Sequence, residues 1–407
     1  MNKNMLENYA KLVVKMGINL QQGQDVRIVI STNQVEFAER LVENCYLVGA
    51  KYVKVDWLNS KISKMKFNYD EQEVLNELRN SRIEKEKEAV EKLPCLIYVE
   101  DSDPDKYKGI DTNKIAEMSK SQYPKIKKYR DAMDNRYQWC IVAMPSIDWA
   151  VKVFPELSEK DAFLQLEKAI IKCTRLENDA VKNWEDHISY LLDKAEKMNS
   201  YNFKELHYSS SNGTDLTLEL QPGHNWLSAR ETHLGGIEYS ANMPTEEVFT
   251  MPKRDGVNGV VYSTKPLSYN GNLIEDFNVV FKDGAAVKVQ AKEGQKVLEE
   301  LIGMDDGAKY LGEVALVPYD SPINKTGILF LNTLFDENAA CHLAFGDSFS
   351  NNLKGYENMS NEEIDESGRN RSMVHVDFMI GSKDLNVVGR TFDGKEVLVF
   401  KNGMWNI

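Results

Sequence analysis

The sequence is poor in cysteine, and its cysteines form no motif. Five cysteines are scattered over 407 residues, none in a C-x-x-C arrangement, and most lie in apolar contexts such as "LPCLIYV" and "QWCIVAM". A disulfide framework needs paired cysteines and a zinc ribbon needs closely spaced ones, so both are excluded. Scattered cysteines in apolar surroundings are typical of buried, reduced thiols, and we expect a cytoplasmic location.

No stretch of the sequence has the character of a membrane segment. There is no apolar run of 18 residues, and the amino terminus, "MNKNMLENYAKLVVKMG", lacks the continuous apolar region of a secretory signal. We therefore expect no membrane partner.

The positive charge that nucleic-acid binding requires is also missing. Lysine and arginine number 50 against 63 acidic residues, which gives a net charge of −13 and a pI near 5.2. The locally basic stretch "KSQYPKIKKYR" fits the solvated face of a helix, because its lysines are not interleaved with aromatics as in a nucleic-acid groove. Nucleic acid is excluded as a partner.

Glycine-rich phosphate loops are absent from the first half, although its strand and helix order is common among nucleotide-binding proteins. Apolar strands alternate with amphipathic helices, which predicts an α/β domain with a parallel sheet and crossover helices. The predicted strands are 26–30, 52–57, 95–100 and 139–145, and the predicted helices include 35–50, 159–175 and 178–199. No G-x-G-x-x-G or G-x-x-x-x-G-K follows a strand, so a nucleotide site is not expected.

Glycine usage changes near residue 200. Only four of the 24 glycines precede that point, so the chain turns far more often in its second half. A chain of this length also exceeds the size at which one hydrophobic core stops growing. We predict two domains, residues 1–199 and residues 200–407.

The second half is predicted to be mainly antiparallel β structure. Asn212-Gly213 and Asp283-Gly284 each stand between two apolar segments, which is the strongest short-range hairpin signal. Short strands separated by turns continue to the carboxyl end, and they could curl into a barrel-like sheet. The fold class is therefore α/β plus α+β.

One predicted strand, "SMVHVDFMIGS" at 372–382, contains an imidazole and a carboxylate among its apolar residues. His375 and Asp377 stand at i and i+2, so their side chains point to the same face about 7 Å apart. They could hydrogen-bond each other on a solvated surface, or they could bind a metal together.

Three other stretches of the second half place acids or an imidazole among apolar residues. Glu246 and Glu247 lie in "ANMPTEEVFTMP", Glu313 in "KYLGEVALVPYD", and Glu337 and His342 in "LNTLFDENAACHLAFGDSF", where a loop is expected to enter a helix. Each has a structural interpretation as well. The first pair could be first-turn acids of a capped helix, Glu313 a solvated strand end, and His342 a core histidine.

Their coincidence in one domain favours a metal site. Several carboxylates with two imidazoles form the ligand set of a pair of divalent ions such as Zn²⁺, Co²⁺, Mn²⁺ or Mg²⁺. Two ions about 3.5 to 4 Å apart need a bridging carboxylate and can share a water that becomes a nucleophile at neutral pH. This is hydrolytic chemistry.

Four motifs, "PTEEVFTMP", "LGEVALVP", "NTLFDENAACHLAFG" and "HVDFMIG", resemble in this order the signature stretches of the thermophilic-type M29 metallo-aminopeptidases. "AMPSIDWA" in the first half is similar too, so the resemblance covers the chain. It implies a homodimeric exopeptidase with two co-catalytic metals in the carboxy-terminal domain. The implied ligands are Glu247, Glu313, Glu337, His342, His375 and Asp377, with Glu313 as the bridge. Whether Glu246 or Glu247 binds metal stays open, and the position in the motif favours Glu247.

The sequence departs from the family at one position. The family commonly has a tyrosine implicated in catalysis where this chain has Phe349, and a phenyl ring cannot donate a hydrogen bond. Either that donor is dispensable, or Tyr356 or Tyr319 replaces it, or activity is reduced. His233, just before the first motif, is a candidate neighbour of the ligands, whereas His187, His207 and His224 are interpreted as ordinary surface or structural residues.

The predicted reaction is hydrolysis of the amino-terminal peptide bond of short peptides by a metal-activated water. Glu313 would hold both ions, and Glu337 or Glu246 would carry a proton to the leaving amine. Two alternatives remain. The first is another binuclear amidohydrolase, such as a dipeptidase or an N-acyl amino acid deacylase. The second is a metal-binding homologue that has lost catalysis, which Phe349 would favour.

Overall fold

The computed structural model describes residues 1–101, 103 and 105–407, which form two compact units. The first unit contains Met1–Glu185 and Arg230–Pro244, and the second contains Asp186–Ala229 and Thr245–Ile407. The sequence predicts a single boundary between residues 199 and 200. In the structure the boundary between the two units lies inside helix α9 (Ala180–Tyr201). Residues 230–244 then belong to the first unit again.

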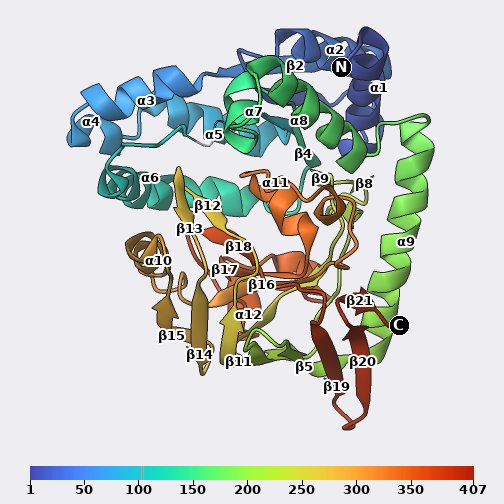
Figure 1. The fold of residues 1–407 in the computed structure, drawn as a ribbon. Coiled ribbons are helices and arrows are strands. Elements are labelled where there is room, and N and C mark those ends of the chain that lie inside the picture. The colour runs from blue at the N-terminus through green and yellow to red at the C-terminus, as the bar shows by residue number, and fades with distance from the viewer. Residues whose placement is uncertain (102, 104) are drawn as a thin grey trace. The chain divides into compact units, whose positions relative to one another are not determined.

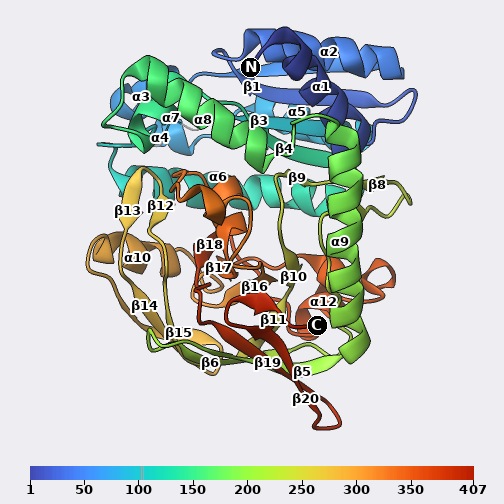
Figure 2. The same cartoon turned by 45° about the vertical axis from the view of Figure 1, so that its right-hand side comes forward.

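The first unit is built on a parallel sheet (Figures 1 and 2). Its five strands, in spatial order, are β2 (Tyr52–Leu58), β1 (Asp25–Ser31), β3 (Cys95–Glu100), β4 (Trp139–Ala143) and β9 (Asn242–Met243). The four predicted strands are present, and all pairings are parallel. The fifth strand, β9, was not predicted, because two residues carry no periodicity. It explains why residues 230–244 belong to this unit.

Helices connect the strands of the first unit. They are α1 (Lys3–Leu12), the π-helical turn η1 (Val13–Gly17), α2 (Val35–Val48), α3 (Ser60–Tyr69), α4 (Gln72–Asn76), α5 (Asn80–Lys92), α6 (Thr112–Met133), α7 (Ile147–Val153) and α8 (Glu159–Cys173). A short antiparallel pair, β7 (Glu231–Thr232) with β8 (Glu238–Tyr239), completes the unit.

Helix α8 shows how the local sequence sets a helix. The Ser158 hydroxyl accepts a hydrogen bond from the Asp161 amide at 3.2 Å, which caps the amino terminus. Glu159 and Asp161 add negative charge at the positive end of the helix dipole. Its buried residues recur at helical spacing and form one apolar stripe: Ala162, Leu166, Ala169, Ile170 and Cys173.

The second unit contains an eight-stranded antiparallel sheet. Its strands, in spatial order, are β15 (Ala285–Gln290), β14 (Asn278–Lys282), β11 (Pro252–Tyr262), β6 (Asp215–Leu220), β5 (Phe203–Ser209), β19 (Asn386–Thr391), β20 (Glu396–Lys401) and β21 (Met404–Trp405). Both predicted hairpins are present as β5–β6 and β14–β15. Asp283 and Gly284 both have positive φ, as a type I′ turn requires.

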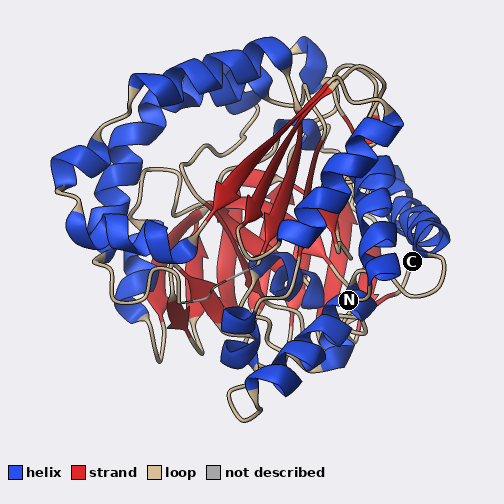
Figure 3. Ribbon diagram, turned by 90° about the horizontal axis from the view of Figure 1, so that it is seen from above, coloured by secondary structure: helices blue, strands red, loops and turns tan. Residues whose placement is uncertain are grey.

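A smaller four-stranded antiparallel sheet carries the candidate site. Its strands, in spatial order, are β10 (Val248–Thr250), β16 (Leu311–Leu316), β17 (His342–Gly346) and β18 (His375–Met379). In the stretch where a loop was expected to enter a helix, the short helix α11 lies just before Glu337, but His342 begins strand β17 rather than lying in a helix. Glu246 and Glu247 likewise precede a strand rather than a helix. The mixed α/β fold with one parallel and further antiparallel sheets confirms the predicted class (Figure 3).

Short elements complete the second unit. They are the β12 (Leu267–Tyr269) and β13 (Asn272–Ile274) hairpin, helices α10 (Gln295–Ile302), α11 (Thr333–Asp336) and α12 (Asn361–Glu366), and the 3₁₀ turns η2 (Asn324–Thr326), η3 (Glu337–Ala339), η4 (Ser350–Asn352) and η5 (Tyr356–Asn358). The capping box at Ser360 and Glu363 fixes the start of α12.

Two findings bear on the expectations drawn from composition. The five cysteines are buried and free, which confirms the prediction of buried thiols. None of the helices in residues 1–101, 103 and 105–407 combines the length and apolar character that crossing a bilayer requires.

Aromatic rings fill the space between the four-stranded and eight-stranded sheets. Phe345 on β17 stacks on Phe378 of β18 with ring centroids 4.7 Å apart. On its other side Phe345 meets Phe281 of β14 at 6.2 Å, and Phe378 meets Phe277 at 5.7 Å. One face of the small sheet is therefore apolar and buried, which leaves the other face for polar side chains.

The Phe345→Ala variant should lose about 3–5 kcal/mol of unfolding free energy, because the vacated space adds a cavity term to the lost burial. Urea unfolding followed by circular dichroism measures this. Phe392→Ala is the matched control, since that ring is half exposed and its removal should change stability by less than about 0.5 kcal/mol. A similar loss in both variants would contradict the assignment of the core.

Candidate metal centre

The register of the small sheet brings four of the predicted residues to one face. Ala344 in the middle of β17 pairs with Glu313 on one side and with Asp377 on the other. Gly346, two residues on, pairs with His375. Paired residues of neighbouring strands point to the same face, so these side chains project together. Alanine and glycine at the centre leave room for the longer side chains to converge.

A β-bulge at Gly312 decides the direction of Glu313. Leu311 pairs with Phe345 on the apolar face, yet Glu313 pairs with Ala344 on the polar face. Without an extra residue, positions i and i+2 would share a face, so the bulge is what turns Glu313 toward the site. Only glycine fits there, because a Cβ atom on Gly312 would lie 2.1 Å from the carbonyl oxygen of Asp347.

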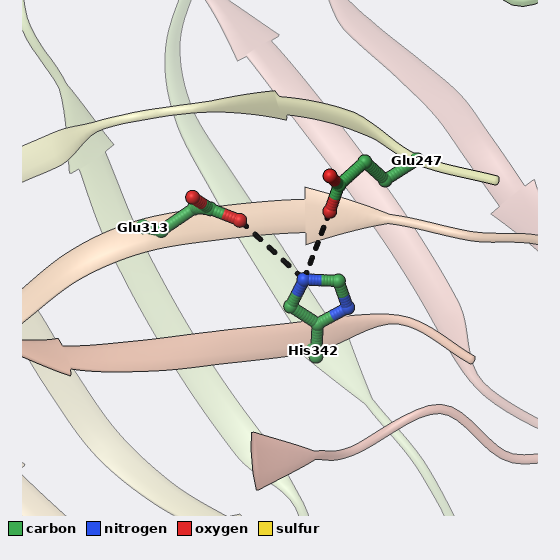
Figure 4. Close-up of side chains that lie close together, drawn as sticks. All are labelled: Glu247, Glu313 and His342. Carbon is green, nitrogen blue, oxygen red and sulfur yellow. Dashed lines mark ion pairs between the residues drawn. The ribbon is translucent and has the colours of Figure 1, made fainter. Parts of the chain in front are cut away.

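Glu247, Glu313 and His342 form the first group of converging side chains (Figure 4). His342 Nε2 lies 3.1 Å from Glu247 Oε2 and 3.4 Å from Glu313 Oε1. One ligand atom from each residue lies within 4.8 Å of the others, which is the spacing that a single cation can span. The three residues come from the start of β10, from β16 and from β17.

Glu313, His375 and Asp377 form a second group. His375 Nε2 lies 3.6 Å from Glu313 Oε2 and 3.4 Å from Asp377 Oδ1. Glu313 therefore belongs to both groups, with Oε1 directed at His342 and Oε2 at His375. Glu313 is thus the residue that the two groups share.

Backbone carbonyl groups orient both imidazoles. His375 Nδ1 lies 2.8 Å from the carbonyl oxygen of Asp347, and His342 Nδ1 lies 3.3 Å from that of Ala340. A carbonyl can only accept, so each Nδ1 carries the proton when the ring is neutral. The lone pair is then on Nε2, which faces the carboxylates. This is the usual support of a metal-binding histidine.

The electrostatics of the site favour a cation. His342 Nε2 and Asp377 Oδ1 are buried and have no hydrogen bond of normal geometry, although charged groups surround them. Burial raises the pKa of Glu313 to about 7, against the opposing effect of His342. Burial alone would lower the pKa of His375, but Asp377 and Glu313 raise it to about 10. The residues present therefore fit divalent ions, which would satisfy the unpaired atoms and neutralise the crowded carboxylates.

Glu337 and Glu246 lie near the two groups but outside them. Burial, together with the carboxylates of Asp377 and Glu247, holds the pKa of Glu337 well above its usual range. Glu246 turns the other way, since its Oε2 lies 3.7 Å from His187 Nε2. The geometry thus separates the two neighbours, with Glu247 at His342 and Glu246 at His187. His187, interpreted from the sequence as ordinary, is buried beside it.

Sequence reasoning missed Asn338, which ties two of the loops together. Its Oδ1 accepts a hydrogen bond from the Glu246 amide at 2.7 Å, and its Nδ2 donates to Glu337 Oε1 at 3.2 Å. Asn338 is fully buried, so both contacts are shielded from water. No pattern in the sequence distinguishes this asparagine. Its position between two implied ligands, Glu337 and His342, was the one available signal.

The secondary candidates have different positions. The Phe349 ring lies 5.0 Å from the His375 ring, measured between centroids. Tyr356 packs instead against the apolar cluster of Met251, Leu353 and Ile364. His233 belongs to the first unit, where its Nδ1 accepts a hydrogen bond from the Gly235 amide at 2.8 Å. Its role near the ligands stays a prediction.

The fold and the site together indicate a class of protein. A mixed α/β chain whose buried carboxylates form two overlapping three-residue groups with a buried and a partly exposed imidazole has the features of a metal-dependent hydrolase. The comparisons with known proteins agree. The sequence matches the thermophilic metalloprotease family (M29) over residues 2–405. The chain belongs to this family, as the motifs predict.

The relatives align along their whole length. Aminopeptidase AmpS of Bacillus subtilis (strain 168) is 44% identical over 402 residues, which cover 98% of each chain. Aminopeptidase 2 of Geobacillus stearothermophilus is 40% identical over 402 residues, covering 98% of this chain and 97% of that one. The solved structure of wild-type AmpT from Thermus thermophilus matches with a TM-score of 0.90 at 36% identity and covers both chains completely.

The Gly312→Ala variant should lose metal affinity by at least about tenfold. The added methyl group meets the carbonyl oxygens of Asp347 and Gly346 at 2.1 and 2.4 Å, so the bulge must shift and Glu313 must move with it. Metal analysis after dialysis against a fixed Zn²⁺ concentration measures the effect. Gly303→Ala, whose nearest contact would be 3.1 Å, is the control. Unchanged metal content in Gly312→Ala would show that the bulge does not set the site.

Metal affinity should rise with pH, because a cation binds neutral imidazole. The pKa of His375 is raised to about 10 in the metal-free protein, and that of His342 is also raised, so both hold protons at pH 7. Each proton released gives about a tenfold gain in affinity per pH unit below that pKa. Calorimetric titration at pH 6, 7 and 8, in buffers of different ionisation enthalpy, counts the protons.

The stability of the metal-free protein should depend on pH in the opposite direction, falling as the pH rises. A raised imidazole pKa stabilises the fold fully below the unfolded value near 6.5, and this contribution is lost as the pH rises toward 10. The metal-free protein should therefore be less stable at pH 9 than at pH 7. Affinity that does not change with pH would mean that the imidazoles are already neutral or do not bind.

Proposed function

We propose that this chain removes the amino-terminal residue of short peptides with two divalent ions held in its second unit. Membership of the M29 family, together with full-length relatives named aminopeptidases, makes the chain an enzyme, a metal-dependent aminopeptidase. The proposal concerns the number of ions and the residues that hold them. One observation carries it, namely that Glu313 belongs to both three-residue groups.

The two groups assign the ligands. Glu247, His342 and one oxygen of Glu313 would hold one ion, and His375, Asp377 and the other oxygen of Glu313 would hold the second. The distances support this assignment, since each imidazole Nε2 faces one oxygen of Glu313 at 3.4 or 3.6 Å. Carboxylate and imidazole are ligands that Zn²⁺, Co²⁺ and Mn²⁺ all accept, so the donor set leaves the metal open.

Two ions, when bound, would polarise the scissile carbonyl and lower the pKa of a water that attacks it. The residues of the chain would position the ions and orient their ligands. Glu313 would fix the separation of the ions, and the carbonyls of Asp347 and Ala340 would keep both imidazoles in the binding tautomer. Glu313 and His342 are buried, which would exclude competing water from that side of the site, whereas His375 is partly exposed.

Glu337 is the proposed proton carrier. Burial and the neighbouring carboxylates raise its pKa, so it holds a proton more readily than an exposed glutamate. Asn338 donates a hydrogen bond to its Oε1, and the Glu337 side chain also hydrogen-bonds Asp377, so a proton held on Glu337 would lie beside the ligands, from where it could pass to the leaving amine. We do not place Glu246 in this role, because its carboxylate faces His187. Glu337 already contacts Asp377, so its predicted role as a further ligand stays part of the proposal.

The free amine that every unblocked peptide shares would be recognised by one of the ions. Two divalent ions would offset the charge of the four carboxyl groups of Glu247, Glu313, Glu337 and Asp377, so no surplus of negative charge is needed. The substrates would therefore be short peptides with a free amine. The homodimer and the cytoplasmic location stay predictions.

The free amine gives the test. After Zn²⁺, Co²⁺ or Mn²⁺ is added, the protein should hydrolyse leucine p-nitroanilide and leave N-acetyl-leucine p-nitroanilide intact, with at least a hundredfold difference in kcat/KM. Removal of metal with a chelator should abolish turnover, and readdition should restore it. Equal turnover of both substrates would point to a different amidohydrolase.

Glu313→Gln supplies the matched variant. The amide keeps the size of the side chain but cannot bridge two cations with two anionic oxygens. Metal analysis should show two ions per chain in the wild type and one or fewer in the variant, with kcat lowered by at least about a thousandfold. A single ion in the fully active wild type would end the two-ion assignment.

A further inference from the structure

Phe349 is an exposed aromatic ring beside a proposed metal ligand. Its side chain is 41% exposed, and its ring centroid lies 5.0 Å from that of His375. The rings that hold the core are different, because Phe345 and Phe378 are completely buried. A single exposed apolar side chain is ordinary in a folded protein, and what distinguishes Phe349 is that its neighbour is a proposed metal ligand.

The same ring touches the opposite edge of the small sheet. Phe349 meets Phe249 of β10 edge to face, with centroids 6.2 Å apart. Phe249 pairs with Ala315, and Ala315 pairs with His342, so Phe249 lies on the face that carries the ligands. His375 lies on that face as well.

These two contacts fix where the ring lies. Phe249 is on β10 and His375 is on β18, the two outer strands of the sheet, with β16 and β17 between them. A ring that contacts both must lie across the middle strands, in front of the face from which Glu313 projects. A substrate residue bound beside His375 would therefore have this ring within reach.

We propose that Phe349 is a specificity-determining residue, the apolar wall against which the side chain of the substrate's first residue packs. This inference rests on the proposed function and names its substrate class, peptides that begin with a large apolar or aromatic residue. An α-amine held at an ion would leave the adjacent side chain beside the ligands, where the exposed Phe349 ring lies 5.0 Å from the His375 ring. Aromatic rings attract aliphatic and aromatic groups through burial and ring contacts.

The selectivity of Phe349→Ala tests the inference. The variant should lose the preference for phenylalanine and leucine over glycine p-nitroanilide, with the ratio of kcat/KM values falling about tenfold, mainly through KM. Phe349→Leu keeps an apolar wall and should retain most of the ratio. Phe392→Ala, which removes another exposed phenylalanine from the turn after β19, should leave the ratio unchanged. An equal loss on all substrates would show that Phe349 only positions His375.

A binding measurement separates this inference from the proposed function. Zn²⁺-loaded proteins are titrated with phenylalanine hydroxamate and with glycine hydroxamate, and no turnover is needed. The affinity ratio should fall about tenfold in Phe349→Ala and stay constant in Phe392→Ala. An unchanged ratio overturns the role of Phe349 whether or not peptides are cleaved. A wild type that shows the ratio but cleaves no free-amine substrate contradicts the proposed function alone.

Discussion

The carboxylate of Glu313 is the interaction on which the candidate site depends. It supplies one oxygen to the group around His342 and the other to the group around His375, so neither group is complete without it. One extra residue in β16, the bulge at Gly312, sets the face from which the Glu313 side chain projects. Without the bulge Glu313 would share the apolar face of Leu311, and with it Glu313 projects from the opposite face. The bulge in β16 thus allows a largely apolar strand to contribute a carboxylate to the polar face of the sheet.

The small sheet divides its two faces between stability and chemistry. Phe345 and Phe378 form the apolar face and pack toward the eight-stranded sheet, whereas His342 and Asp377 project from the other face. Buried carboxylates and imidazoles are costly without counter-charges, so this face is stable only if the rest of the unit compensates. The aromatic core supplies that compensation, and divalent ions would relieve the remaining repulsion. Loss of metal should therefore affect folding as well as activity.

Around the ligands, the structure assigns supporting contacts that differ in kind. Backbone carbonyls of Asp347 and Ala340 orient the imidazoles, and Asn338 links the loop of Glu246 to Glu337. Phe349 lies across the face as an apolar surface. Tyr356, one of the two predicted replacements for the family tyrosine, packs against an apolar cluster, and its role in catalysis stays a prediction, as does that of Tyr319.

The sequence by itself determined the strands with clear alternation, both hairpins, the M29 family and the residue types of the site, because periodicity, turn residues and motifs are local. It could not assign β9, whose two residues gain their partner from a segment 100 residues away, or strand β17, whose short run resembles a helix. Only the tertiary structure decided that Glu247 and not Glu246 meets His342, that Glu313 is shared, and that Asn338 joins the loops. Those outcomes depend on strand register and on one bulge, and pairing between distant strands leaves no trace in the local order of residues.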